Sequence, residues 1–312
     1  MQIKISDELL NNKPELERFL HYISMKGISH SICTENINEV LKSTSQQPMI
    51  KETIKGLLEK QINNIQFKNT IEVSVNDSSK GKITIGKLDA YLSKSPLVVV
   101  ENEINDLSFI QTILYATGNR KIADTHGKLW EISSIGGCGQ IPALLEQKIS
   151  NKTPSSRIFV LHDSDKHYPQ ESLSKTHTNI INKCKRLGVK YHTLKRREAE
   201  NYIIDEIILN RNKTDIDFCN AWEELTSAQK SHYDFKYGFS NKPYNHKDYS
   251  GLFSNISESM RQSLHNGFGK DISSEVYIKE HYSYYEPKKI TAWSSNVMHE
   301  FRKISESIKD IL

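Results

Sequence analysis

The stretch "RIFVLHDSDKHYP", residues 157–169, passes from apolar to acidic within a few positions. Residues 158–161 are all apolar and predict a short strand that is covered on both faces. Asp163 and Asp165 follow directly, with one serine between them. Like charges this close repel each other, and burying them unpaired is costly. The sequence therefore predicts a partner for them: a metal ion, an Arg or Lys cluster, or simply water.

Strands and helices alternate on both sides of this stretch. The segments PLVVVEN (96–102), KLWEISS (128–134) and VKYHTLKRR (189–197) predict three further strands. Helical spacing of apolar residues fills the intervals, and the segment EAENYIIDEIILNR (198–211) predicts a closing helix. This order predicts an α/β domain over residues 95–211, with parallel strands and right-handed crossovers.

The flanking regions have different patterns. Residues 1–68 predict helices, and TIEVSVNDSSKGKITIGKL (70–88) predicts a β-hairpin that turns at NDSSKGK. We therefore expect residues 1–94 to form an N-terminal α+β region for docking or dimerisation. Residues 212–312 predict a mostly helical C-terminal region with contacts to nucleic acid or a partner. The expected fold class is α/β, a parallel sheet flanked by helices.

Composition indicates which partners and which cellular compartment to expect for the protein. The chain has 312 residues and a net charge of +4, which is compatible with nucleic acid but weak support for it. The four cysteines form no CxxC pair, which argues against a zinc knuckle or a disulfide framework and favours the cytoplasm. We expect no membrane span, and the absence of a GxxxxGK[ST] loop means that any ATP is expected to be used by another chain.

Acidic residues follow most of the predicted strands of 95–211. The carboxyl ends of parallel strands meet at one edge, where ligands bind. The strand ends carry, in order, Glu101, Glu103 and Asp106; Gly136, Gly137 and Gly139; Asp163 and Asp165; and Arg196, Arg197, Glu198 and Glu200. Converging carboxylates suit hard divalent cations. We expect two Mg²⁺ ions, with Mn²⁺ as a substitute, that clamp a phosphodiester.

The order of these motifs resembles a known family. A strand-end Glu, a Gly-bearing turn and then DxD is the pattern of the TOPRIM domain. The segment RREAENYI (196–203) resembles the REIENYL segment of TOPRIM nucleases of the OLD (overcoming lysogenization defect) type and of the standalone AriB-like effectors of phage defence. The resemblance covers residues 95–211 and not the flanks.

The resemblance implies roles for individual residues. Metal-binding and catalytic acids would be Glu101, Asp106, Asp163, Asp165 and Glu200. The family motif EGxxD is ENEIND here, so Asn102 replaces the glycine and the Asp comes one residue late. Glu103 is therefore an alternative to Asp106. The distal lysine of OLD nucleases would be Lys288 or Lys289, although no local motif supports that transfer.

Several other residues have two open interpretations. Gly137 contacts a substrate phosphate or only makes a turn. Arg196 and Arg197 contact a phosphate or only balance the charge of nearby acids. His162 and His167 are structural or shuttle protons. Cys138 lies in the Gly-rich turn, but no Cys–His pairing is evident in the sequence. The segment 233–249 interleaves lysines with aromatic residues, which suits single-stranded nucleic acid or a loop packed on the core.

The function that we expect is a metal-dependent endonuclease acting on DNA, or on RNA such as tRNA. The resemblance implies a role in anti-phage defence with a partner ATPase, and a homo-oligomer is compatible with it. Two alternatives stay open: a TOPRIM transesterase, and a catalytically degenerate module that binds or regulates a partner.

Overall fold

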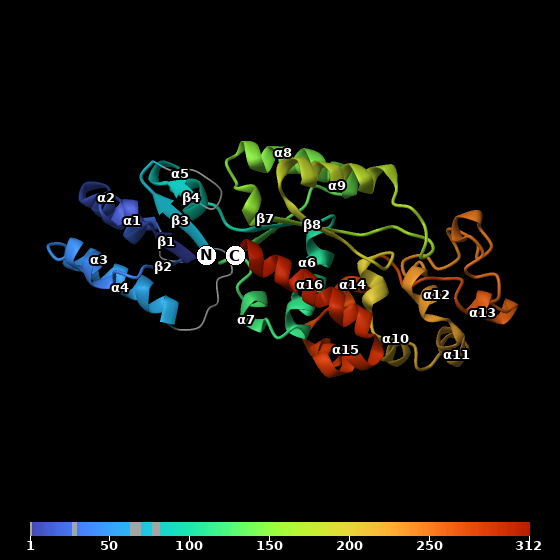
Figure 1. The fold of residues 1–312 in the computed structure, drawn as a ribbon. Coiled ribbons are helices and arrows are strands. Elements are labelled where there is room, and N and C mark those ends of the chain that lie inside the picture. The colour runs from blue at the N-terminus through green and yellow to red at the C-terminus, as the bar shows by residue number, and fades with distance from the viewer. Residues whose placement is uncertain (1, 27–29, 63–69, 77–81) are drawn as a thin grey trace.

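The structure is a computed structural model that describes residues 2–26, 30–62, 70–76 and 82–312. Its described residues contain two sheets of four strands each, and all the pairings between their strands are parallel. The first sheet belongs to the N-terminal unit and the second to the remainder of the chain (Figure 1). The expected α/β class is therefore confirmed.

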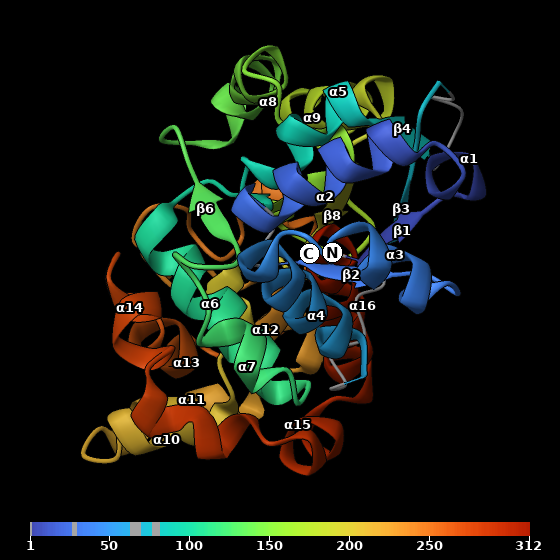
Figure 2. The ribbon, with the colours of Figure 1, turned by 90° about the vertical axis from the view of Figure 1, so that its left-hand side faces the viewer.

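The N-terminal sheet has the strand order β2-β1-β3-β4. Figure 2, in which the N-terminal unit faces the viewer, shows the strands in this order with α4 beside β2. The unit has its own core, which includes Ile3, Phe19 and Val73. Its elements are β1 (Gln2–Ile5), α1 (Asp7–Leu10), α2 (Lys13–Lys26), β2 (Ser31–Cys33), α3 (Ile37–Ser43), α4 (Pro48–Ile62), β3 (Thr70–Ser74), β4 (Lys82–Thr84) and α5 (Ile85–Leu92).

This unit differs from its sequence prediction in two ways. Residues 2–5 and 31–33 form strands where only helices were expected, because a strand of three or four residues is too short to stand out beside long helical spacing. The β-hairpin is also wrong: β3 and β4 pair in parallel. Alternating apolar residues mark a strand but do not reveal its direction. Most of the expected turn, residues 77–81, lies outside the described residues.

The second sheet has the strand order β6-β5-β7-β8, and its four strands occupy the positions that the sequence predicted. They are β5 (Leu97–Val99), β6 (Glu131–Ser133), β7 (Ile158–His162) and β8 (Lys190–Thr193). Every residue of β7 is buried, as its apolar sequence requires. Phe159 and Leu161 face one core, whereas Ile158 and Val160 face another.

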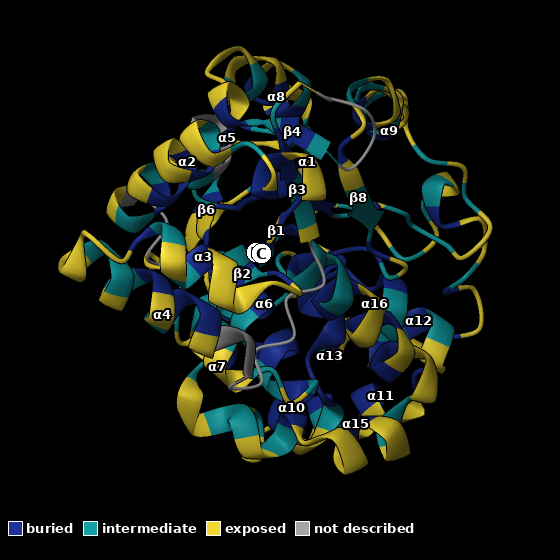
Figure 3. Ribbon diagram, turned by 60° about the vertical axis from the view of Figure 1, so that its left-hand side comes forward, coloured by how far each residue is buried: buried dark blue, intermediate teal, exposed yellow. Residues whose placement is uncertain are grey.

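Helices cover both faces of this sheet (Figure 1). The core on one face includes α8 (Ile141–Ser150) and α9 (Lys175–Leu187), and the core on the other includes α6 (Glu103–Ala116) and α16 (Ser295–Ile311). Ser174 caps the start of α9, and Gly188 ends it with φ 66°. In Figure 3, α8 carries exposed residues on its outer turns, whereas α6 has exposed residues only at its start, Glu103 and Ile104.

The predicted helix over 198–211 is interrupted. Residues Ala199–Tyr202 form a 3-10 turn, η3, and α10 begins only at Asp205. Glu198 and Asn201 form a capping box at this turn, which satisfies backbone groups that a continuous helix would use. Ile203 and Ile204 are extended between the two elements.

The C-terminal region is mostly helical, as expected, and it shares a core with the second sheet. That core runs from Val98 to Ile311 and so crosses the boundary expected at 211/212. None of the described helices is long and apolar enough to cross a membrane. The remaining helical elements are α7 (Arg120–Ala123), η1 (Cys138–Gln140), η2 (Ser155–Arg157), α10 (Asp205–Arg211), α11 (Ile216–Glu224), α12 (Ser227–His232), η4 (Lys247–Tyr249), α13 (Glu258–Ser263), α14 (Ile272–Val276), η5 (Lys279–Tyr285) and α15 (Pro287–Trp293).

Candidate metal centre

Carboxylates from three parts of the chain meet at the carboxyl edge of the second sheet. Glu101 follows β5, and its Oε1 accepts a hydrogen bond of 3.3 Å from the backbone N–H of Asp163, which follows β7. Asp163 Oδ1 in turn accepts one of 3.1 Å from the N–H of Ala199, in the segment after β8. These bonds connect the ends of the three strands side by side. Glu101, Asp163 and the ENY segment (200–202) therefore lie together at one edge of the sheet, as the sequence predicted.

Asp106 joins this group from the first turn of α6. Its Oδ2 accepts hydrogen bonds from the N–H groups of Glu101, at 3.2 Å, and Asn102, at 2.9 Å. Asn102, which stands where the family motif has glycine, uses its side chain to cap α6 through the N–H groups of Ile104 and Asn105. Glu103 is exposed. The structure therefore places Asp106, rather than Glu103, beside the other acids.

The DxD loop is fixed by the segment after β8. The N–H groups of Ser164 and Asp165 both donate to the carbonyl oxygen of Arg197, at 3.1 and 3.0 Å. Ser164 Oγ donates to the carbonyl oxygen of Arg196 at 2.8 Å. Asp165 adopts a left-handed conformation with φ 52°. The Asp165 side chain is 51% exposed and so forms the open end of the cluster.

Glu198 and Glu200 are buried at the other end of the cluster, where they share a lysine. Lys236 Nζ lies 2.9 Å from Glu198 Oε2 and 3.4 Å from Glu200 Oε1. Glu198 also accepts a hydrogen bond of 3.1 Å from Arg197 Nε. Glu198 is 8% exposed, so it is not a surface charge but a buried member of the cluster.

Crowding and burial make negative charge unfavourable at this edge. Burial, with Asp165 and Asp106 nearby, raises the pKa of Glu101 to about 7. Burial and the charge of Glu200 raise the pKa of Asp106 to about 6. The pKa of Asp163 is raised well above its usual value by burial and by Glu101 and Asp106, and burial also raises that of Glu200. The carboxylates lack a sufficient counter-charge, which is what a cation site requires.

Lys236 belongs to a tightly held turn within 233–249, where the sequence showed lysines interleaved with aromatic residues but did not place one of them beside the acids. Asp234 Oδ1 accepts hydrogen bonds from the N–H groups of Lys236 and Tyr237, and Asp234 Oδ2 accepts one from Arg197. A Cβ on Gly267 would lie 2.5 Å from the backbone of Lys236 and Tyr237, so residues 236–237 and 267 are in direct contact. The alternation of YDFKYGF was the available sign, since Tyr233 and Phe235 are buried in the core between these polar residues.

The residues expected to contact a phosphate are mostly engaged elsewhere. Arg197 is buried and paired with Glu198 and Asp234. Arg196 donates to the Asn201 carbonyl oxygen at 2.5 Å, and its guanidinium stacks over Trp293. Neither guanidinium is presented to a ligand at the edge.

The other two predicted phosphate contacts are also not free at the edge. The N–H of Gly137 donates to the carbonyl oxygen of Glu101 at 3.3 Å, so this glycine, with φ 108°, shapes the turn beside Glu101 instead. Lys288 is exposed on α15, and among the described residues no ion pair connects it to the edge acids. Lys236 is the lysine that the structure brings to them.

The aromatic residues of 233–249 mainly pack on the core. Tyr233, Phe235, Phe239 and Tyr249 are buried, and Tyr237 is 38% exposed. Of the two open interpretations, the structure favours the packed loop. Asn201 and Tyr202 likewise brace the fold: the Asn201 amide donates to the carbonyl oxygens of Lys230 and Tyr233, and the Tyr202 hydroxyl donates to Glu300.

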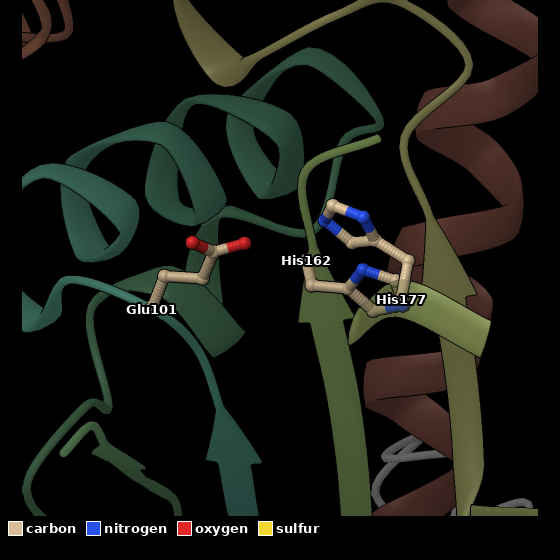
Figure 4. A group of neighbouring side chains, drawn as sticks. All are labelled: Glu101, His162 and His177. Carbon is tan, nitrogen blue, oxygen red and sulfur yellow. The ribbon is translucent and has the colours of Figure 1, made fainter. Parts of the chain in front are cut away.

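Two histidines lie beside Glu101 (Figure 4). Glu101, His162 and His177 each have a potential ligand atom within 4.8 Å of the others. Both ring nitrogens of His162 have partners, however: Nδ1 bonds the Asp163 carbonyl oxygen at 2.8 Å and Nε2 bonds Thr193 Oγ1 at 3.0 Å. Burial lowers the pKa of His162 to about 4, so its ring is neutral. We therefore interpret His162 as structural rather than as a ligand.

Comparisons with known proteins give no further guide to this site. No protein-family model, no curated protein and no solved structure matches the chain. The chemistry of the edge must therefore be argued from its own residues.

Proposed function

We propose that this protein is a nuclease of the TOPRIM type that hydrolyses phosphodiester bonds in DNA or RNA with divalent metal ions. The observation that supports the proposal most is the convergence of Glu101, Asp106, Asp163 and Glu200 on one partly buried edge with raised pKa values. A purely structural cluster gains nothing from such repulsion. A divalent cation would reverse it.

The donor atoms are of the kind that Mg²⁺ or Mn²⁺ prefers. Among the described residues, however, no three of Glu101, Asp106, Asp163 and Glu200 have ligand atoms that all lie within 4.8 Å of one another, so an ion would have to draw these carboxylates together. The side chains at the buried end of the edge offer carboxylate oxygens, the ligands that hard divalent cations prefer. Glu101, Asp106, Asp163 and Glu200 would hold the ion. Bound Mg²⁺ would supply an activated water and would offset charge on the leaving oxygen. The backbone N–H groups that bond Asp106 and Asp163 orient these carboxylates before any ion binds.

Lys236 is the cation that the chain itself supplies. The carboxylates of Glu198 and Glu200 raise its pKa although burial opposes them, so the ammonium stays charged. An ammonium has three N–H donors, and Lys236 forms ion pairs with Glu198 and Glu200. A remaining N–H can donate to a non-bridging oxygen of the scissile phosphate. We propose Lys236, in place of Lys288, as the residue that steadies this phosphate.

The setting of the activity is proposed from the sequence resemblance. The segment 196–203 resembles that of phage-defence effectors, so we propose that the nuclease acts in anti-phage defence under the control of a partner ATPase. An unregulated nuclease would damage its own cell. Expression with and without a candidate partner, scored by cell growth and phage plating, tests this part separately.

The nuclease is tested by incubating the protein with supercoiled plasmid and with bulk tRNA in Mg²⁺, in Mn²⁺ and in EDTA. We expect cleavage in either metal and none in EDTA. Lys236→Gln should lose activity, whereas Lys288→Gln, its matched control, should retain it. Metal-independent cleavage, or no cleavage of either substrate with the partner present, would contradict the proposal. A tyrosine-linked DNA product would favour a transesterase instead.

A further inference from the structure

His177 is a buried residue at the metal edge that the proposed nuclease chemistry does not use. Its side chain is 2% exposed. Nδ1 lies 2.9 Å from Ser174 Oγ, the residue that caps α9. Nε2 is buried and has no hydrogen-bond partner among the described residues. A buried polar atom without a partner is costly, so its presence calls for a ligand or another explanation.

The side chains around His177 Nε2 are themselves potential ligands. Asp165 Oδ2 lies 3.4 Å from Nε2. Potential ligand atoms of Cys138, Asp165 and His177 all lie within 4.8 Å of one another. Cys138 comes from η1, which packs against α9, so the three residues are contributed by three neighbouring elements. This is the Cys–His proximity that was not evident in the sequence.

These donors differ from those at the buried end of the edge. A thiol, an imidazole and a carboxylate form a mixed sulfur, nitrogen and oxygen set, which favours Zn²⁺ over Mg²⁺. Two nitrogen or oxygen ligands that are each about 2.0–2.1 Å from a tetrahedral ion are separated by about 3.4 Å. The distance of 3.4 Å between Nε2 and Asp165 Oδ2 matches this value. The half-exposed Asp165 leaves the remaining position open to solvent.

We propose that Asp165, His177 and Cys138 form a second cation site that binds Zn²⁺, separate in its chemistry from the carboxylate site that takes Mg²⁺. Glu101 lies between the two, since it neighbours His177 on one side and Asp106 and Asp163 on the other. The inference extends the proposed function, because it names the ion that binds at the Asp165 end of the carboxyl edge of the second sheet. The binding itself does not depend on nuclease activity.

Three features prepare these residues for the ion. Ser174 Oγ can accept a hydrogen bond from Nδ1–H, which leaves the lone pair on Nε2 as metal-bound histidines require. The left-handed backbone of Asp165 and its bond to the Arg197 carbonyl oxygen fix the direction of that carboxylate. Gly136 and Gly137, with φ 77° and 108°, allow the backbone turn that brings Cys138 beside Asp165 and His177.

The test uses Co²⁺ as a spectroscopic probe for Zn²⁺ on the full chain after chelator treatment. We expect one equivalent of Co²⁺ to give the intense visible bands of a four-coordinate ion and a near-ultraviolet thiolate-to-Co²⁺ band. Zn²⁺ should bleach both, whereas a large excess of Mg²⁺ should not.

Variants of the ligands and matched controls identify the site. Cys138→Ser should remove the thiolate band, and His177→Gln should weaken Zn²⁺ binding by at least about 10–100-fold, the loss typical even of a residue that only supports a ligand. Ser174→Ala should weaken it less. Cys219→Ser and His265→Gln, which lie on α11 and on an exposed turn, should change neither. Thermal melting of each variant separates lost binding from lost folding.

Two outcomes would overturn the inference: Zn²⁺ that binds no more tightly than Mg²⁺, or a thiolate band that persists in Cys138→Ser. The two proposals fail in different ways. Metal-dependent cleavage in Mg²⁺ without any Co²⁺ bands would reject the Zn²⁺ site and keep the nuclease. Co²⁺ bands in a protein that cleaves no nucleic acid would reject the nuclease and keep the site.

Discussion

The two sheets of this protein share one topology but differ at their carboxyl edges. Each has four parallel strands. In each, the first strand lies between the second and the third, and the fourth pairs with the third. Each also has a separate core. The same arrangement therefore offers two equivalent edges where a ligand can bind.

Among the described residues, the second sheet brings acids from three strand ends together at its edge, whereas the side-chain bond across the first edge joins Asn76 to a single acid, Glu8. After β1, Ser6 Oγ accepts from Leu9 N at 3.1 Å, and after β2, Thr34 Oγ1 accepts from Asn36 N at 3.1 Å. These polar groups cap their own local turns. At the second edge, Glu101 instead accepts from Asp163, a contact between residues 62 positions apart. The topology provides the edge, and side chains that bond across strands make the site.

Replacing Asp163 with Asn should have the largest effect and should act in opposite directions on activity and stability. The amide keeps the oxygen that accepts from Ala199 but removes a buried charge. Cleavage should fall by at least about 10³-fold, since metal ions contribute several kcal/mol to such transition states. Because the pKa of Asp163 is raised in the folded state, the metal-free variant should unfold at a higher temperature than the wild type.

The matched change at the other edge is Ser6→Ala. It should lower the free energy of unfolding by about 1 kcal/mol, the usual cost of a lost helix cap, and leave cleavage unchanged. Measurements of kcat/KM and of chemical denaturation check both variants. If Ser6→Ala impaired catalysis as much as Asp163→Asn, the two edges would not differ as we argue.

Asp106→Asn should have the next largest effect, and Glu103→Gln is its control on the same turn of α6. Asp106 is held by two backbone N–H groups, whereas Glu103 is exposed. We expect Asp106→Asn to reduce cleavage by about 10²-fold, because small displacements of catalytic groups cost that much. Glu103→Gln should stay within about twofold, as surface substitutions do. The reverse order in kcat/KM would assign the second acid to Glu103.

The sequence predicted the second sheet well because its pattern is local. Four short apolar strands, each followed by glycine or acids, were enough to bring Glu101 and Asp163 to one edge. The sequence indicated Lys236 only as one of the lysines interleaved with aromatic residues in 233–249, and it did not indicate His177 at all; both reach the edge through the packing of residue 267 and of α9, which the sequence does not show. The strands β1 and β2 were missed because three or four residues give too little periodicity.

Gly267→Ala tests whether the turn that carries Lys236 depends on close packing. The added Cβ would meet the backbone of Lys236 and Tyr237 at 2.5 Å, so the chain must move. We expect a loss of about 1–3 kcal/mol in the free energy of unfolding, as for other overpacked sites, together with weaker cleavage. Denaturation and kcat/KM measure the two effects. Wild-type values for both would mean that Lys236 is not held by this contact.

The pH dependence of the free energy of unfolding tests the crowding of charge at the second edge, and we expect it to be a smaller effect than those above. The pKa of Glu101 is raised from 4.5 to about 7, so the folded metal-free protein keeps a proton that the unfolded chain has lost. Its stability contribution therefore falls as pH rises from 4.5 toward about 7. Buried histidines with lowered pKa values, such as His162, act in the opposite direction. The difference between wild type and Glu101→Gln isolates the carboxyl group.

We expect Glu101→Gln to become progressively more stable than the wild type over that pH range in EDTA, and the gap to close in saturating Mg²⁺. Melting temperatures of both proteins, measured side by side at each pH, check this. A gap that stays constant with pH would mean that Glu101 titrates normally and that its surroundings impose no charge penalty.

Gly56→Ala, in the N-terminal unit, should have the smallest effect and the opposite sign to Gly267→Ala. Gly56 lies inside α4, and a Cβ there would meet no atom within 4 Å. Alanine restricts the unfolded chain and favours the helix, so the free energy of unfolding should rise by about 0.5–1 kcal/mol. Cleavage should not change, because the stabilised unit has its own core. Denaturation that shows only the N-terminal transition shifting upward would establish that the two sheets unfold separately, whereas a single shifted transition would show that they unfold together.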